Sequence, residues 1–376
     1  MKRILVPVLF LLIMAGVGCS SDKNDKAIEN AREVTLMLVP GINNPRNSEG
    51  DFITLKDGRI LFVYTHFTGD SFEDHAPAYL AGRFSADSGK TWTKEDQTIV
   101  SNDGGLNVMS VSLVRLNNGN IALFYVRKNS MTDCIPLVRI STDEAQTWSE
   151  PIPCISDQKG YFTINNNRVI VLNNGRLLMP VSRHQRNNEP FNYKGTSMCY
   201  ISDDNGVTWK SSKTVPNPNN VLTQEPGVIA LKNGKIMMLM RTEENVQYMS
   251  LSKDSGMTWT PIAPTTISSP LSPASISRIP LTGDLMLVWN DNNGSTPATK
   301  TRRTPFNIAL SKDDGNTWMP PKTIENNPDG SYCYTAIHYV GRYVLLSYCA
   351  GSYSQRTPLS VTCIARVKLS YLYDRK

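Results

Sequence analysis

Several signatures of common protein classes are absent from this sequence of 376 residues. No dense run of lysine or arginine occurs, so the net charge of +6 does not indicate a nucleic-acid-binding surface. No CxxC pair is present, which argues against a zinc site. No stretch keeps a long period of 3.6 residues, which argues against a mainly helical fold. In an exported chain the cysteines after the N-terminus either form disulfides, such as Cys134–Cys154 and Cys349–Cys363, or remain buried thiols.

The apolar run at the N-terminus, Ile4–Val17, is too short to span a membrane. It follows the basic Met1–Arg3 and ends in small residues before Cys19, which is the pattern of a bacterial lipoprotein signal. We therefore expect residues 1–18 to be a signal peptide and residues 19–32 to be a tether lipidated on Cys19. This predicts an exported lipoprotein of the outer membrane or cell surface, or a periplasmic or secreted protein if the cysteine is not lipidated.

A turn motif of the form Ser-x-Asp-x-Gly-x-Thr-Trp recurs at intervals of about 50 to 60 residues, which indicates one repeated supersecondary unit. The five copies begin at Ser85, Ser141, Ser202, Ser252 and Ser311. In the second copy Ala145 replaces glycine. An aspartate in a tight turn accepts local backbone N–H groups, and the tryptophan is expected to pack between units. We interpret the motif as structural, and we expect neither a metal nor another cofactor.

Short alternating apolar runs flank glycine turns throughout the chain, which is the pattern of β-hairpins. The six turns contain Gly58, Gly119, Gly175, Gly234, Gly283 and Gly341. Six four-stranded units predict an all-β fold, a six-bladed β-propeller that spans residues 33–376 as one domain. The sixth unit has no Ser-x-Asp turn, so we expect Glu33–Val39 to supply its fourth strand and close the ring. We expect a monomer.

An antiparallel four-stranded blade gathers specific strand ends at one face of the ring. The start of its first strand, the end of its second and the start of its third lie together, opposite the glycine and Ser-x-Asp turns. This rule collects arginines, carboxylates and tyrosines on one rim: Arg46, Asp74, Glu225, Arg241, Arg302, Arg303, Tyr332 and Tyr334. Clustered guanidinium groups bind carboxylates or phosphates through paired N–H donors, so the rim predicts a site for an anionic ligand.

The stretch Gln224–Arg241 resembles a motif of bacterial sialidases (neuraminidases) of glycoside hydrolase family 33. A glutamate opens one strand and an arginine closes the next, sixteen residues later, and these sialidases also carry Ser-x-Asp turns, known as Asp boxes or BNR repeats. The resemblance implies a retaining exo-α-sialidase acting on sialylated or other acidic glycans. Such enzymes use an arginine triad, a tyrosine nucleophile assisted by glutamate, and an aspartate acid/base. A neutral tyrosine avoids repulsion by the substrate carboxylate.

The resemblance assigns roles to particular positions. It implies Arg46, Arg241 and Arg303 as carboxylate ligands, Glu225 as the base, Asp74 as the acid/base and Tyr332 as the nucleophile. Arg302, Asp70 and Tyr334 remain the alternatives, because Tyr334 lies two residues after Tyr332 and is expected on the same strand face. The family motif Phe-Arg-Ile-Pro is replaced here by Pro45–Ser48. This departure keeps two other functions open, a glycosidase for another acidic sugar and a non-catalytic glycan-binding propeller.

Overall fold

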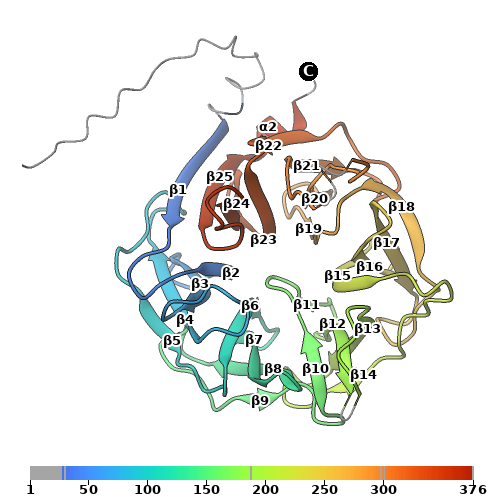
Figure 1. Ribbon diagram of the computed structural model, residues 1–376, viewed down its shortest axis with the longest axis horizontal. Coiled ribbons are helices and arrows are strands. Elements are labelled where there is room, and N and C mark those ends of the chain that lie inside the picture. The colour runs from blue at the N-terminus through green and yellow to red at the C-terminus, as the bar shows by residue number, and fades with distance from the viewer. Residues whose placement is uncertain (1–27, 29–30, 187–188, 297–298, 300, 375–376) are drawn as a thin grey trace, which may run out of the picture.

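The computed structural model describes residues 28, 31–186, 189–296, 299 and 301–374. Its β-strands form a ring of six blades around a central axis (Figure 1). The signal peptide predicted for residues 1–18 and the lipidation site Cys19 lie outside the described residues. No helix in the described part of the chain is long and apolar enough to cross a membrane.

Blades I to III follow one another along the chain, each with its first strand nearest the axis (Figure 1). Blade I contains β2 (Asn47–Thr54), β3 (Ile60–Phe67), β4 (Ala78–Ser85) and β5 (Gln97–Val100). Blade II contains β6 (Asn107–Arg115), β7 (Ile121–Ser130), β8 (Asp133–Ser141) and β9 (Ile152–Pro153). Blade III contains β10 (Gly160–Thr163), β11 (Ile170–Val171), β12 (Leu177–Arg186), β13 (Thr196–Ser202) and β14 (Lys210–Ser211).

Blades IV to VI complete the ring. Blade IV contains β15 (Thr223–Ala230), β16 (Ile236–Thr242), β17 (Val246–Ser252) and β18 (Ala263–Ser268). Blade V contains β19 (Ser275–Arg278), β20 (Leu285–Trp289), β21 (Phe306–Ser311) and β22 (Lys322–Glu325). Blade VI contains β23 (Gly330–Val340), β24 (Tyr343–Ser352), β25 (Thr362–Lys368) and, from the other end of the described chain, β1 (Arg32–Leu38). A short helix, α2 (Leu369–Tyr373), follows β25.

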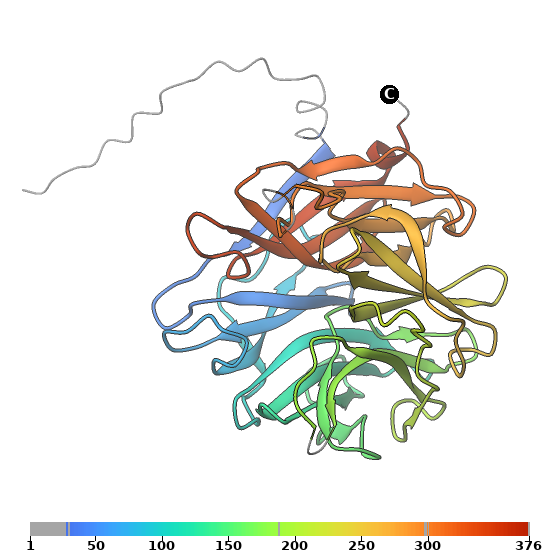
Figure 2. The same ribbon diagram turned by 45° about the vertical axis from the view of Figure 1, so that its right-hand side comes forward.

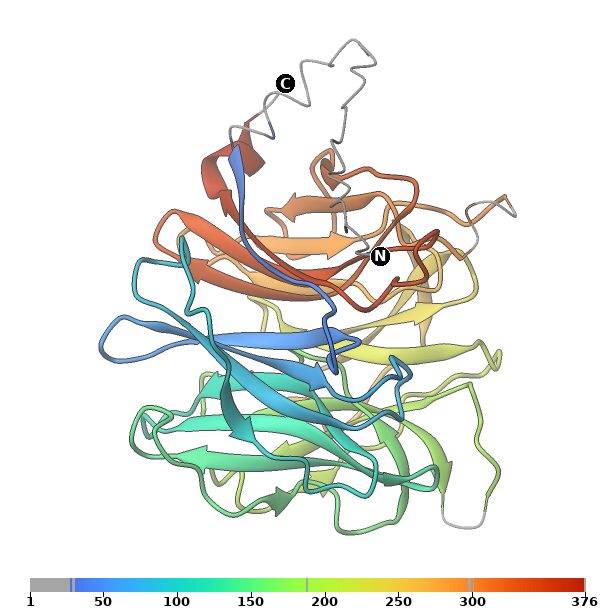
Figure 3. The same ribbon diagram turned by 60° about the vertical axis from the view of Figure 1, so that its left-hand side comes forward.

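The predicted closure of the ring by the N-terminal strand is confirmed. Strand β1 pairs antiparallel with β25, from Arg32 opposite Val367 to Leu38 opposite Thr362, and Figure 3 shows the two strands running side by side. Leu38 also packs in a buried cluster with Phe62 of blade I and Leu345 of blade VI. Closure therefore joins the two ends of the described chain through both hydrogen bonds and apolar contact, and it covers the outer edge of β25.

The Asp-box turns have the structural role predicted for them. In the fourth copy, Asp254 accepts hydrogen bonds from the Thr258 N–H at 2.9 Å and the Thr258 hydroxyl at 2.6 Å, while Ser252 donates to it at 2.8 Å. The residue before the glycine, Ser255, has a φ of 56° and Gly256 a φ of 88°, which explains why glycine is favoured there. The motif tryptophans pack against the blade cores; Trp209, for example, meets Phe124 edge-on at 5.7 Å.

Blade III departs from the predicted regular pattern. Its innermost strand is divided into β10 and β11 by residues 164–169, and β10 makes a single parallel pairing with β8, Tyr161 opposite Cys134. This pairing merges blades II and III into one nine-stranded sheet. The oblique view of Figure 2 shows the strands of the blades tilted against one another, with loops projecting from the ring. The six cysteines of the described chain are free and buried, so no predicted disulfide is present.

Candidate active site

The innermost strands of four blades share one irregularity near their beginning. Strands β2, β6, β15 and β23 each place two residues opposite one residue of the neighbouring strand, which is a β-bulge. The first extra residue in each bulge has a positive φ: Glu49, Ser110, Glu225 and Tyr334. Left-handed backbone at a non-glycine residue is strained and is concentrated at functional sites. The bulges re-aim four polar side chains toward one end of the ring.

Tyr334 and Glu225 meet across the ring although 109 residues separate them. The Tyr334 hydroxyl donates to Glu225 Oε1 at 3.4 Å, a long contact. The other carboxylate oxygen, Oε2, lies 3.0 Å from Arg241 Nη1 and accepts from Asn165 Nδ2 at 3.1 Å. Burial and the charge of Glu225 raise the pKa of Tyr334, an effect that Arg303 and Arg241 partly offset. A neutral phenol therefore faces an acceptor carboxylate.

Two arginines flank this pair. Arg241 is held by Gln224, whose side-chain oxygen accepts from both Nε and Nη2. Its Nη1 forms an ion pair with Glu225 but has no aligned hydrogen-bond acceptor among the described residues. Arg303 donates from Nη1 to Cys333 Sγ at 3.0 Å, and its guanidinium carbon lies 5.2 Å from the centre of the Tyr334 ring. A buried donor without an acceptor is costly, so the Nη1 group of Arg241 is suited to an incoming anion.

The structure separates the two candidate tyrosines, so the expectation that they share a strand face is wrong. The bulge of β23 begins after Cys333, which breaks the alternation on which that expectation rested. Tyr332 is 6 % exposed in an apolar cluster, with its ring 6.0 Å from that of Phe306 and 6.3 Å from that of Tyr348. Only Tyr334 of the two contacts Glu225.

Arg46 and Asp74 form a second group on the same rim. Arg46 is 2 % exposed and donates to Asp74 at 2.6 Å, to Glu49 at 2.8 Å and to the Ser48 hydroxyl at 3.0 Å. Burial works to raise the pKa of Asp74, but the Arg46 guanidinium outweighs it and lowers that pKa. The Asp74 side chain is 60 % exposed, so solvent screens part of this ion pair. The rival aspartate, Asp70, is also exposed but makes none of these contacts.

Sequence reasoning did not find Glu49, which links the two groups. Its carboxylate bonds Arg46 and the Ser110 hydroxyl, and the charge of Glu225 acts on it. Burial, the largest effect, raises the pKa of Glu49. No motif marked this residue, because its orientation depends on the bulge. Arg302, the alternative to Arg303, instead places its guanidinium carbon 4.2 Å from the centre of the Tyr353 ring.

Sequence reasoning also missed Asn165 and Arg168, which reach the site from the divided innermost strand of blade III. The run of three asparagines before Arg168 was the available signal, because consecutive short amides suit irregular backbone better than a strand. Within the described ranges no group of three or more His, Cys, Asp or Glu side chains is arranged to hold a metal ion.

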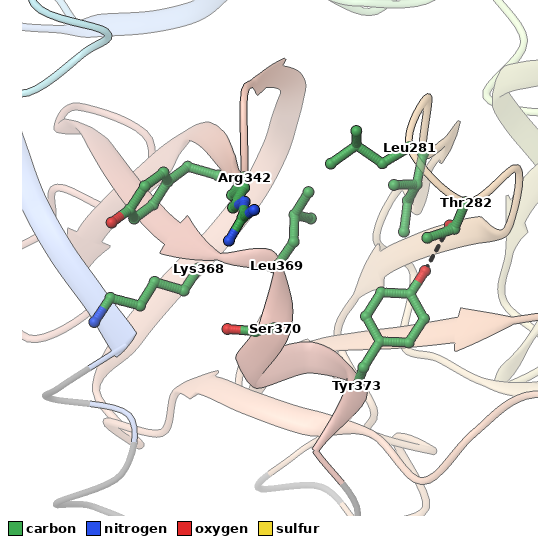
Figure 4. A pocket seen from close by; sticks show the side chains of 9 residues that line it. Leu281, Thr282, Arg342, Lys368, Leu369, Ser370 and Tyr373 are labelled. Carbon is green, nitrogen blue, oxygen red and sulfur yellow. Dashed lines mark hydrogen bonds between the residues drawn. The ribbon is translucent and has the colours of Figure 1, made fainter.

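A separate cavity of about 420 Å³ lies near the opposite face, between blades V and VI and α2 (Figure 4). Leu281 and Leu369 line it together with Arg342, and the hydroxyl groups of Thr282 and Tyr373 are hydrogen-bonded at 2.7 Å on its wall. Its lining residues include no carboxylate. The cavity lining therefore lacks a carboxylate like the one that faces Tyr334 at the other end of the ring.

The fold and the Asp-box turns agree with the comparison against protein families. The chain belongs to the family of BNR repeat-like domains, which matches residues 67–344. Curated relatives are sialidases. That of Paraclostridium sordellii is 28 % identical over 230 residues, 55 % of either chain. That of Bacteroides fragilis (strain YCH46) is 26 % identical over 325 residues, 76 % of this chain and 57 % of the relative. The matches thus span little more than half the length of these two relatives.

Solved structures of sialidases share the propeller. The Hadza microbial sialidase Hz136 superposes with a TM-score of 0.70 at 20 % identity, covering 87 % of this chain and 66 % of its own. A leech intramolecular trans-sialidase has the same TM-score at 14 % identity, covering 90 % and 71 %. A Dyadobacter fermentans protein of unknown function also reaches 0.70, at 19 % identity, covering 90 % of this chain and all of its own. At these identities the likeness concerns the fold.

Proposed function

We propose that this protein is a retaining exo-α-sialidase in which Tyr334 is the nucleophile and Glu225 its base. The contact between the Tyr334 hydroxyl and Glu225 Oε1, flanked by Arg241 and Arg303, carries this proposal. The sialidase relatives support the substrate class. A phenol has an ordinary pKa of about 10, so it needs an adjacent base to act as a nucleophile near neutral pH.

We assign each of these groups a role in two chemical steps. Glu225 accepts the phenolic proton as the Tyr334 oxygen bonds to the anomeric carbon, and the bond to the leaving oxygen breaks. Asp74 protonates that leaving oxygen. In the second step Asp74 takes a proton from water, the water oxygen replaces Tyr334 at the anomeric carbon, and Glu225 returns the proton to the phenolate. Two displacements retain the anomeric configuration.

Binding of the substrate carboxylate prepares Asp74 for its role. In the free protein Arg46 holds Asp74 as an ion pair, which favours the ionised form of an aspartate that must start the reaction protonated. A substrate carboxylate placed among Arg46, Arg241 and Arg303 replaces Asp74 as an acceptor for Arg46. The exposed Asp74 side chain is then released to take up a proton and face the leaving group.

A fluorogenic α-sialoside and a sialylated glycoprotein test this proposal together. We expect release of the fluorophore and of free sialic acid, and we expect proton NMR to detect the α-anomer of the sugar before it mutarotates. The absence of turnover on both substrates would refute the sialidase activity. Release of the β-anomer first would preserve the activity but refute the covalent Tyr334 step.

A glycosidase for a different acidic sugar is the second candidate. Arg46 already bonds two carboxylates, Glu49 and Asp74, and the residues after it depart from the Phe-Arg-Ile-Pro motif. A screen of polysaccharides containing uronic acids or other keto-acid sugars tests it. Carbohydrate binding without any product, unchanged in Tyr334→Phe, would instead identify a glycan-binding propeller.

We also propose export and lipidation on Cys19, supported by the N-terminal sequence alone. Expression of the full chain with a radiolabelled fatty acid tests the lipid. The wild type should carry label in the membrane fraction, and Cys19→Ala should carry none. Equal labelling of the two would refute lipidation at this cysteine.

A further inference from the structure

The segment Asn165–Arg168, which we call the central segment, crosses toward the propeller axis between β10 and β11 (Figure 1). Asn166 donates to the backbone oxygens of Gly50 in blade I, at 2.8 Å, and of Tyr334 in blade VI, at 3.0 Å. The backbone N–H of Arg168 donates to Ser112 of blade II at 2.9 Å. One irregular segment of blade III therefore ties three other blades together at the axis.

The neighbouring asparagines extend these links. Asn167 donates to the buried Asp51 at 2.8 Å and accepts from the N–H of Ile337 at 3.1 Å. Asn165 donates to Glu225 Oε2 at 3.1 Å, which connects blade IV as well. The central segment therefore bonds the backbone of the strand that carries Tyr334 and the side-chain carboxylate of Glu225, so it helps to fix the position of each reacting group relative to the other.

Arg168 is the unusual member of the central segment. The residue is 4 % exposed, yet its guanidinium makes no hydrogen bond or ion pair with any other described side chain or backbone group. A Cβ built on Gly227 would come within 2.9 Å of Arg168 Nη1, so the missing side chain there makes room for the guanidinium. Gly227 is two residues after Glu225, which places the positive charge next to the strand that carries the base.

The groups that act electrostatically on Arg168 are those of the proposed reaction. Burial, the largest effect, lowers the pKa of Arg168 to about 10, while the charges of Glu225 and Tyr334 raise it. An unpaired buried charge costs stability, and replacing it with an apolar side chain of similar length is commonly neutral or stabilising. Packing alone therefore does not account for an arginine at this position.

We propose that Arg168 and Asn165 are positioning residues for the Tyr334–Glu225 pair. Asn165 orients the carboxylate, and Arg168 supplies a fixed positive charge that stabilises the negative charge as the proton passes from the phenol to Glu225. The inference rests on the proposed sialidase chemistry. Because both residues act through Glu225 and Tyr334, the effect of Arg168 belongs to the chemical step more than to binding.

The test compares Arg168→Met with the wild type on the fluorogenic sialoside. We expect kcat to fall by about 10- to 100-fold, as for loss of one preorganised electrostatic group. Binding of a non-hydrolysable sialic-acid analogue should change by less than about threefold, because the charge of Arg168 acts on the transition state and not on the bound substrate. The acidic limb of the kcat/KM profile should move to higher pH, because the ionised base loses a positive neighbour. The melting temperature should be equal or higher.

Three further variants make the result specific. Arg168→Lys keeps the charge and should recover most of kcat. Gly227→Ala adds a methyl group that displaces Arg168 Nη1, and it should lower kcat although no charged residue is substituted. Arg176→Met is the matched control. Arg176 directly follows the glycine turn of the same blade, away from Glu225 and Tyr334, and it bonds Asp203 at 2.6 Å. It should leave kcat unchanged.

Several outcomes would overturn the inference. One is wild-type kcat in Arg168→Met, and another is a selective loss of analogue binding, which would make Arg168 a substrate ligand. A lower melting temperature with unchanged pH profile would make it structural. If the wild type turns over no sialoside, the proposed function fails separately. NMR titration of ¹³C-labelled Glu225, assigned with Glu225→Gln, then decides: its midpoint should move to higher pH in Arg168→Met, and an unchanged midpoint would refute the electrostatic role.

Discussion

The tyrosine pair of β23 gives the sharpest prediction, because the same substitution at two positions two residues apart should have opposite outcomes. Tyr334→Phe removes the oxygen that lies 3.4 Å from Glu225 Oε1. Tyr332→Phe removes a hydroxyl from a side chain that is 6 % exposed among Phe306 and Tyr348. Each change deletes one oxygen atom and leaves the ring in place, so packing is preserved in both variants.

The two variants should differ by orders of magnitude in kcat and only slightly in the free energy of unfolding. Loss of a covalent nucleophile should lower kcat by at least about 1,000-fold, or about 4 kcal/mol in the activation barrier. The long Tyr334–Glu225 contact contributes at most about 1 kcal/mol to folding. Burial raises the pKa of Tyr332 to about 12, and no hydrogen bond of its hydroxyl is present among the described residues. Tyr332→Phe should therefore change the free energy of unfolding by less than about 1 kcal/mol.

The assay measures kcat on the fluorogenic sialoside and the urea midpoint of each variant. We expect Tyr332→Phe to keep kcat within about twofold, as substitutions away from the reacting atoms do. Both variants should unfold cooperatively at a midpoint close to that of the wild type. Full activity in Tyr334→Phe together with an inactive, folded Tyr332→Phe would refute the argument from the β-bulge.

Three other predictions concern stability and the acid/base. Asp51→Ala removes the acceptor of three donors, the buried N–H groups of Phe52 and Leu113 and the half-buried amide of Asn167. It should lower the free energy of unfolding by about 3 kcal/mol in urea titrations; a loss below 1 kcal/mol contradicts this. Hydrogen bonds from Thr258 and Ser252 outweigh burial and lower the pKa of Asp254 to about 2. The pKa of Asp254 in the folded protein lies below its ordinary value of 3.8. The contribution of the ionised Asp254 to the free energy of unfolding is therefore complete above about pH 4 and is lost as the pH falls toward 2. The melting temperature should fall less steeply over that range in Asp254→Ala; parallel curves would exclude the contribution. Asp74→Ala should slow sialosides with poor leaving groups far more than nitrophenyl sialosides, and equal slowing would argue against an acid role.

Much of the fold was predictable because its signals are local. An Asp-box turn contains its own donors and acceptors, as the bonds of Asp254 to Ser252 and Thr258 demonstrate. Glycine turns specify hairpins through the backbone conformation they allow. The pairing of β1 with β25 was predictable as well, because a propeller with three strands in its last blade has an open edge that only one remaining segment matches.

From the sequence, the site could be predicted only as a group of polar residues on one rim of the ring, without the contacts between them. Blade register placed Glu225 and Arg241 at one end of the ring, because strand direction alone decides which strand ends meet. The choice between Tyr332 and Tyr334 depended on a bulge in β23, which shifts the alternation of side chains and has no local signature in the sequence. Arg168 could not be placed, because the central segment follows no strand period and its direction is set by bonds to other blades.

The sequence by itself therefore determined the repeat, the hairpins, the closure of the ring and the face on which polar residues gather. Each of these depends on interactions within about 20 residues or on the count of strands. Tertiary structure decided which tyrosine meets Glu225, and that Arg46 bonds Asp74 and Glu49. It also placed Arg168 beside the base, with no hydrogen-bond partner for its buried Nε among the described residues. Those contacts join blades that are far apart in the chain, so they exist only once the ring has closed.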